Sequence, residues 1–106
     1  MRGSALAVAC VMMLAAAPAG AQTSLTIVQM GRAFHSGEIA IARGETLTFR
    51  NRDDFIHQIY IKSDSMTFDS NEQPPGQNGL VSFPAAGAFE VRCHIHPRMS
   101  LIVHVK

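Results

Sequence analysis

The chain closes with VRCHIHPRMSLIVHVK, residues 91–106, which is the most informative stretch for the fold class. Its flanks, VRC at 91–93 and LIVHVK at 101–106, are apolar and nearly alternating, which is typical of β-strands with one buried face. Between the flanks, a cysteine, two histidines and a methionine fall within residues 93–99. The pattern predicts two strands joined by a short turn that carries thiol, imidazole and thioether groups at one edge of a sheet.

Similar alternating runs occur upstream, separated by turn segments such as ARGE, NRDD and PAAGA. With the two C-terminal runs included, the predicted strands cover residues 24–30, 38–42, 46–51, 57–62, 80–84, 88–93 and 101–106. This spacing predicts an all-β sandwich of two sheets with about seven or eight strands. Residues 63–79 are polar and rich in Pro, Gly, Ser and Asn, which indicates a crossover between the sheets, anchored to the core by Met66 and Phe68.

Residues 1–21 have the composition of an export signal. Arg2 is followed by an apolar run over residues 5–17 and then by small residues up to Ala21. The run is shorter than the roughly 20 apolar residues that a membrane-spanning helix needs. The sequence therefore predicts cleavage after Ala21 and a mature domain over residues 22–106 with no membrane span.

Charge and cysteine content narrow the possible functions of the exported chain. Loss of Arg2 leaves eight basic and eight acidic side chains, with no basic run, so nucleic acid is not an expected partner. Cys10 lies in the predicted signal, and Cys93 is then alone in a compartment where thiols are normally paired. A lone exported cysteine needs either protection from oxidants or a chemical role.

Strand alternation places two of the reactive side chains inside the sandwich. Cys93 shares a face with Phe89, and His57 shares a face with Ile59, because side chains two residues apart point the same way. His57 is expected at the start of its strand and Cys93 at the end of another. Both could therefore meet at the same end of the sandwich.

The four side chains His57, Cys93, His96 and Met99 together make the donor set of a blue-copper site, with three strong ligands in a plane and a weak axial sulfur. Sulfur donors suit Cu(I) and imidazoles suit Cu(II), so the set favours electron transfer. Each residue alone has an ordinary structural explanation as a core cysteine, a hydrogen-bonded histidine or a core methionine. Zinc could also bind the Cys and His side chains, but Met99 is a poor zinc ligand.

Two segments resemble the cupredoxins, most closely the amicyanin-like and plastocyanin-like group. FRNRDDFIHQIYI, residues 49–61, is similar to the family's aromatic-x-Asn segment that leads to its first histidine ligand. PAAGAFEVRCHIHPRM, residues 84–99, is similar to the family's strand running into Cys-x2-His-Pro-x-Met. With the weaker strand ARGETLTFRN, the resemblance covers most of residues 24–106.

The resemblance implies a Greek-key β-sandwich that binds one copper ion per chain. His57, Cys93 and His96 would be the equatorial ligands and Met99 the axial ligand. Asn51 matches a family Asn whose hydrogen bonds tie the first ligand loop to the loop that holds the cysteine. The resemblance also implies the bacterial periplasm as the location.

Several positions depart from the family pattern. His94 stands where relatives usually have Thr or Ser, which puts the loop-to-loop hydrogen bond from Asn51 in question. Ile56 and Ile95 stand where a proline commonly precedes each ligand histidine, so the groups that orient the ligands are expected to differ. Alternation points His94 away from Cys93, toward the other face. The remaining histidines are expected at the surface: His35 and His104.

A docking patch for a redox partner is expected around His96, the ligand nearest to solvent in such a site. The apolar residues that the sequence offers for this patch are Ile95, Pro97, Phe55 and Met30. Arg98 beside the patch would favour an acidic partner. The likeness to amicyanins suggests an amine-oxidising dehydrogenase and a c-type cytochrome as transient partners of a monomeric carrier.

The function predicted from the sequence is that of a periplasmic type 1 copper protein that shuttles single electrons. It is not expected to be an enzyme, since the closed donor set leaves no open coordination position and no acid-base pair is visible beside it. One alternative is a periplasmic copper carrier or buffer that delivers Cu(I) to an acceptor protein with the same ligands. A further alternative is a β-sandwich interaction module in which Cys93 is merely buried.

Overall fold

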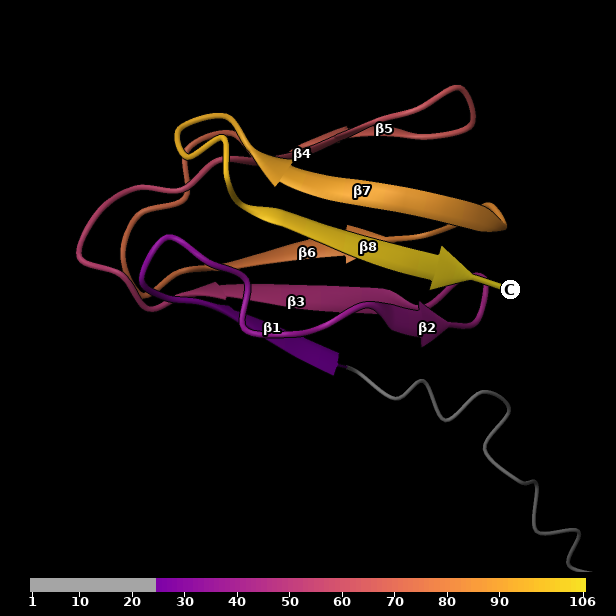
Figure 1. Cartoon of the computed structure of the whole chain (residues 1–106), viewed down its shortest axis with the longest axis horizontal. Helices are drawn as coiled ribbons and strands as arrows, with labels where there is room; N and C mark the ends of the chain where they lie inside the picture. Colours follow the sequence, from indigo (N-terminus) through magenta and orange to yellow (C-terminus); the bar gives the residue numbers. More distant parts are fainter. Residues whose placement is uncertain (1–24) are drawn as a thin grey trace, which may run out of the picture.

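The computed structural model describes residues 25–106 as eight strands in two sheets (Figure 1). The predicted export signal over residues 1–21 lies outside the described residues. The strands are β1 (Leu25–Gln29), β2 (Ile39–Ile41), β3 (Thr46–Asn51), β4 (Ile59–Lys62), β5 (Thr67–Asp69), β6 (Asn78–Ser82), β7 (Gly87–Cys93) and β8 (Ser100–Val105). Nothing within residues 25–106 forms a helix with the length and apolar character that a membrane crossing needs.

The two sheets stack as a β-sandwich. The smaller sheet has the order β1-β3-β6, and the larger has the order β2-β8-β7-β4-β5. β1 pairs in parallel with β3, and β2 pairs in parallel with β8, while all other pairs are antiparallel. The chain crosses between the sheets five times, after β1, β2, β3, β5 and β6. The predicted Greek-key sandwich is confirmed.

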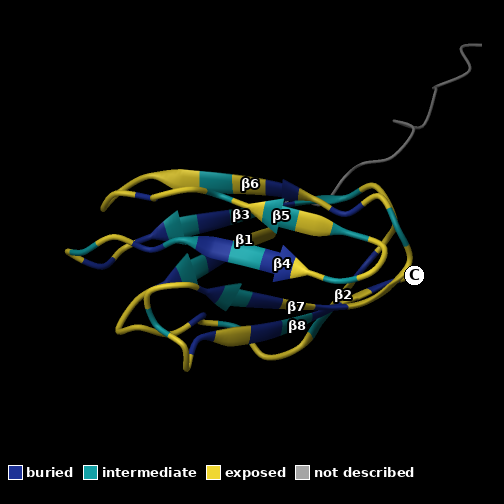
Figure 2. Ribbon diagram, turned by 90° about the horizontal axis from the view of Figure 1, so that it is seen from above, coloured by how far each residue is buried: buried dark blue, intermediate teal, exposed yellow. Residues whose placement is uncertain are grey.

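Alternation along the strands builds the core between the sheets (Figure 2). In β3 every second residue is buried, so that Leu47, Phe49 and Asn51 face inward. Burial of each large apolar side chain stabilises the fold by roughly 1.5–3 kcal/mol. The buried apolar side chains are Ile27, Phe34, Ile41, Leu47, Phe49, Ile59, Ile61, Val81, Phe83, Phe89, Val91, Cys93, Met99, Leu101, Val103 and Val105.

The predicted crossover over residues 63–79 is wrong in one respect, because it contains the short strand β5. β5 pairs with β4 in a hairpin and forms the edge of the larger sheet. Short polar edge strands are common because they discourage pairing with other molecules. Because β5 is short and polar, it lacks the alternating apolar pattern from which the other strands were predicted. Met66 and Phe68 pack against the core as predicted, and residues 70–77 cross to the smaller sheet.

The donor-bearing loops gather at one end of the sandwich. β1 and β3 end there, β6 begins there, and the end of β7 lies beside the start of β4 through the pairing of Cys93 with Ile59. The end of β8 lies at the opposite end of the molecule (Figure 1). The sequence prediction that His57 and Cys93 meet at one end is confirmed by this topology.

Candidate metal centre

The loop between β3 and β4 is shaped by the buried side chain of Asn51. Its amide group donates to the carbonyl oxygens of Phe55 at 2.8 Å and Gln73 at 2.9 Å, and its side-chain oxygen accepts from the backbone N–H of Asp53 at 2.9 Å. These bonds fold residues 51–55 into a tight turn and fasten the turn to the crossover at Gln73. No bond from Asn51 reaches the loop that holds Cys93, as the departure at His94 suggested.

His57 is completely buried and is fixed from two sides. Its backbone pairs with Gln73 in an isolated bridge, with N···O distances of 3.1 and 2.7 Å. Its ring nitrogen Nε2 lies 2.7 Å from Oδ2 of Asp53. Because a carboxylate accepts hydrogen bonds, Nε2 carries the proton, and Nδ1 is left with a free lone pair for a metal ion.

Asp53 is itself held by the backbone of a neighbouring loop. The N–H of Gly31 donates to Oδ1 at 2.6 Å, and the N–H of Arg32 donates to Oδ2 at 3.3 Å. Burial raises the pKa of Asp53, but the hydrogen bonds from Gly31, His57 and Arg32 outweigh it and hold this pKa below its usual value. The carboxylate is therefore ionised and orients His57, as carboxylates often do for metal-binding histidines.

The second loop begins at Cys93, the last residue of β7, whose thiol is buried. The backbone N–H of His94 donates to the carbonyl of Gln58 at 2.9 Å, which joins this loop to the first. The N–H of Gln58 in turn points at Sγ of Cys93 at 3.5 Å. A hydrogen bond to the thiolate withdraws electron density from sulfur and helps to set the reduction potential of a metal bound there.

Three donor atoms converge at the meeting point of these loops. Sγ of Cys93 lies 3.7 Å from Nδ1 of His57 and 3.7 Å from Nδ1 of His96, and the two nitrogens are 3.2 Å apart. An ion with three planar donors at about 2.0–2.3 Å would hold those donors about 3.5–3.7 Å from one another. The residues therefore fit a single metal ion in a trigonal set of one thiolate and two imidazoles.

Met99 is buried, with 1% of its surface exposed, and follows the donor turn directly. Its backbone N–H donates to the carbonyl of His96 at 3.0 Å, which closes the loop before β8 begins. The side chain thus lies in the core at the same end as the three donors. Its role as axial ligand remains a prediction.

Aromatic rings surround the two histidines. The ring of Phe55 lies 5.4 Å from that of His57 and 5.1 Å from that of His96, and the two imidazoles are 4.9 Å apart. Burial is the main cause that lowers the pKa of His96; the proximity of His57 and Arg32 lowers this pKa further, while Asp53 opposes them. A lowered pKa keeps His96 in the neutral form that binds metal ions.

The other histidines lie outside the donor group. His94 is exposed, stacks on the ring of Tyr60 with centroids 3.8 Å apart, and lies 3.1 Å from a carboxylate oxygen of Asp69. It is thus directed away from the donor atoms, as alternation predicted. His35 and His104 are both exposed, in agreement with the sequence analysis.

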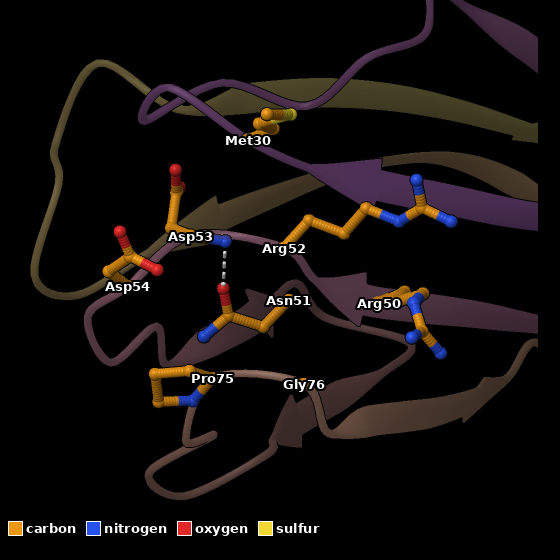
Figure 3. A pocket seen from close by; sticks show the side chains of 8 residues that line it. All are labelled: Met30, Arg50, Asn51, Arg52, Asp53, Asp54, Pro75 and Gly76. Atoms are coloured by element: carbon orange, nitrogen blue, oxygen red, sulfur yellow. Dashed lines mark hydrogen bonds between the residues drawn. The ribbon is translucent and has the colours of Figure 1, made fainter.

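Two recesses open at this end of the molecule. One, of about 410 Å³, is lined by Gly31, Arg32, Ile95, His96, Pro97 and Arg98. The other, of about 470 Å³, is lined by Met30, Arg50, Asn51, Arg52, Asp53, Asp54, Pro75 and Gly76 (Figure 3). Met30 is half-exposed but belongs to the second recess, so its predicted place around His96 is not supported, whereas Ile95 and Pro97 do lie beside His96.

Sequence reasoning missed the polar side chains that hold the first loop. The sequence pattern places Asp53 in a turn and Gln73 in a polar crossover, but both side chains are buried. Gln73 donates to the carbonyl of Phe49 at 2.6 Å and accepts from Gln29 at 3.1 Å. The one usable signal was an acidic residue four positions before His57, while nothing in the sequence marked Gln73 or Gln29.

The fold and the donor group define a copper-binding β-sandwich, and comparisons with known proteins agree. The model of the family "Copper binding proteins, plastocyanin/azurin family" matches residues 21–106. The chain belongs to this family, the cupredoxins, and binds one copper ion.

Individual relatives support the same family assignment. The methylamine utilization protein MauL of Methylophilus methylotrophus is 38% identical over 66 residues, which is 58% of this chain and 38% of MauL, so the chain matches about two fifths of that relative's length. A Cu(I) amicyanin mutant superposes with a TM-score of 0.72 at 19% identity, over 78% of this chain and 82% of amicyanin. The resemblance to the amicyanin-like group is thereby confirmed.

An enzyme shares the same fold. The Cu-containing nitrite reductase NirK from Thermus scotoductus SA-01 superposes with a TM-score of 0.71 at 23% identity, over 78% of this chain but 22% of NirK. The sandwich is therefore used both as a small protein and as a module of a larger enzyme. The fold alone does not decide between a carrier and an enzyme.

Proposed function

We propose that the chain is a mobile one-electron carrier of the bacterial periplasm. His57, Cys93 and His96 would hold its copper ion, with Met99 as the weaker fourth donor. The observation that carries this proposal is the convergence of three donor atoms, 3.2 to 3.7 Å apart, from two loops that are fastened to each other. Bound copper supplies the Cu(I)/Cu(II) couple.

The surrounding residues explain why such a site suits electron transfer. Asp53 and Gln73 hold His57 in place, and the pairing of His94 with Gln58 holds the loop of Cys93. Donors that are already in position move little when the charge of the ion changes, so little reorganisation energy is needed. His96 is partly exposed and lines a recess, so an electron can leave along its ring.

The proposal includes no substrate turnover. Four donors leave no position open for a substrate, and the acidic group nearest to His57, Asp53, is engaged in hydrogen bonds. The name of the relative MauL refers to methylamine utilization, which supports an amine-oxidising dehydrogenase as electron donor. The proposal further includes a c-type cytochrome as acceptor and a monomeric carrier. The family match begins at residue 21, which supports an export signal over residues 1–21 and a mature domain over residues 22–106.

The optical spectrum of the mature protein during titration with Cu(II) tests the proposal. We expect a strong thiolate-to-copper absorption band that saturates at one equivalent, bleaches on reduction and returns on reoxidation without loss of metal. The copper content is measured after several redox cycles.

Loss of copper on reduction would favour the alternative, a periplasmic carrier or buffer that delivers Cu(I) to an acceptor protein. Absence of any stoichiometric metal binding would refute both functions. Tight zinc binding alone would show that the donor group is not selective for copper.

A further inference from the structure

The recess at His96 combines an apolar floor with two arginine side chains. Ile95 is 46% exposed and Pro97 is exposed, and both line the recess together with the edge of His96. Arg32 and Arg98 line the same recess from two different loops. Among residues 25–106, no acidic side chain contributes to its lining, so the described surface around His96 is locally positive.

Arg32 is held in position before any partner arrives. Its backbone has a φ of 56°, a left-handed conformation that is fixed by the hydrogen bond from its N–H to Asp53. Its guanidinium group lies 4.7 Å from the centre of the Phe55 ring, and that ring lies 5.1 Å from the ring of His96. Because the guanidinium is already stacked, less conformational entropy is lost when it binds an anion.

Neither arginine is neutralised within the described part of the chain. Among residues 25–106, no salt bridge involves Arg32 or Arg98, whereas Arg92 pairs with Glu90. The acidic residues closest in sequence to the first ligand do not face this recess. Asp53 is buried against His57, and Asp54 lies in the other recess, where Figure 3 shows Arg50 and Arg52 pointing away from both carboxylates.

We propose that this recess is the docking site for the acidic surface of a redox protein, with a carboxylate of the partner bound between Arg32 and Arg98. The inference rests on the proposed electron-transfer function and adds the chemistry of the partner to it. Arginine binds carboxylates through paired hydrogen bonds, and complementary charge speeds encounter and fixes orientation. Ile95 and Pro97 supply the apolar contact that a protein surface, rather than a free anion, would cover.

The exchange at this site moves one electron and makes no bond. With copper bound, the reduced protein would give up one electron from the Cu(I)/Cu(II) couple to an oxidised partner, which would gain that electron with no proton transfer. The edge of His96 would lie against the partner, with Arg32 and Arg98 holding the acidic surface in register. The same contact serves the reverse transfer from a reduced donor.

A charge-reversed copy of the protein serves as a defined acidic partner. The variant R32E/R98E carries carboxylates where the wild type carries arginines. Reduced, ¹⁵N-labelled, copper-loaded wild type is mixed with small amounts of oxidised, unlabelled variant, and the electron exchange rate is measured from NMR line broadening. The control is R43E, which reverses one positive charge rather than two, in the turn between β2 and β3 at the opposite end of the sandwich.

At low salt, we expect electron exchange between wild type and R32E/R98E to be about tenfold or more faster than self-exchange of the wild type. The oppositely charged recesses of wild type and variant attract each other, whereas two positively charged wild-type recesses repel each other. The difference should largely disappear at high ionic strength, and R43E should exchange within about twofold of the wild type. Equal rates for all pairs at low salt would overturn the inference. An altered copper spectrum in R32E/R98E is excluded first by optical absorption.

Oxidation by hexacyanoferrate(III) distinguishes failure of the docking proposal from failure of the proposed electron-transfer function. If reduced wild type is not oxidised by this reagent, or loses copper, the proposed electron-transfer function fails. If the wild type is oxidised without loss of copper, but the charges at residues 32 and 98 do not change the electron exchange rate, only the docking proposal fails.

Discussion

The two loops that carry the donors hold them by different means. The first loop contributes one imidazole, His57, and fixes it through buried polar groups, chiefly Asp53, Asn51 and Gln73. The second loop contributes a thiol and an imidazole only three positions apart, and its geometry follows from the short chain between β7 and β8. A metal ligand can therefore be positioned either by buried side chains that contact it or by its spacing from another ligand in the sequence.

Cys93→Ser should have the largest effect, because it removes the only thiolate from the second loop. We expect the intense absorption band of the copper form to disappear and a pale copper centre to remain at most. The measurement is the visible spectrum with one equivalent of Cu(II). An unchanged spectrum would remove Cys93 from the site and the second loop from its central role.

Asp53→Ala should weaken copper binding by about 10- to 100-fold, since loss of the group that orients a ligand histidine has effects of this size. The absorption band should still form at saturating copper. Affinity is measured by competition with a chelator, with Asp54→Ala as the exposed control. If the two variants bind copper equally well, the first loop does not depend on its carboxylate.

Gln73→Leu should lower the free energy of unfolding of the copper-free protein by about 1–3 kcal/mol, because the buried carbonyl of Phe49 and the amide of Gln29 lose their partner. Denaturant unfolding measures the change. Gln77→Leu is the control, since the side chain of Gln77 is exposed. Equal stability of both variants would argue that the polar network does not support the first loop.

Met99→Leu should retain the absorption band and raise the reduction potential, because an axial sulfur donates weakly to Cu(II) and its loss favours Cu(I). Voltammetry of the copper form measures the shift. Complete loss of copper would instead make Met99 a primary ligand. An unchanged potential would leave it as a core residue of the second loop.

His94→Ala should have the smallest effect, because His94 contacts Tyr60 and Asp69 on the outer surface rather than the donor atoms. The absorption band and copper affinity should match those of the wild type, and stability should change by about 0.5 kcal/mol or less. A clear shift of the band would show that the second loop holds its donors through its outer face as well.

The sequence predicted the sandwich and the convergence of the donors because both depend on local periodicity. Alternation alone was enough to turn Cys93 and His57 inward, and the spacing of Cys93, His96 and Met99 was visible in the C-terminal run. These features need no knowledge of contacts between distant residues. The prediction was therefore strongest for the second loop.

The supports of the first loop could not be predicted in the same way. The contact between Gln73 and Gln29 joins residues 44 positions apart, and polar residues are normally expected at the surface. Asp53 was equally plausible as an exposed turn residue until the fold buried it against His57. β5 was missed because three residues at a polar edge give too little alternation to recognise.

The direction of β8 offers a practical means of attachment. This strand leaves the donor end at Ser100 and finishes at Val105, about 17 Å away at the usual rise per residue, at the opposite end of the sandwich (Figure 1). A linker joined after Lys106 would therefore fasten the molecule to an electrode or a fusion partner by its far end. The recess at His96 would then face the solution, free to meet its redox partners.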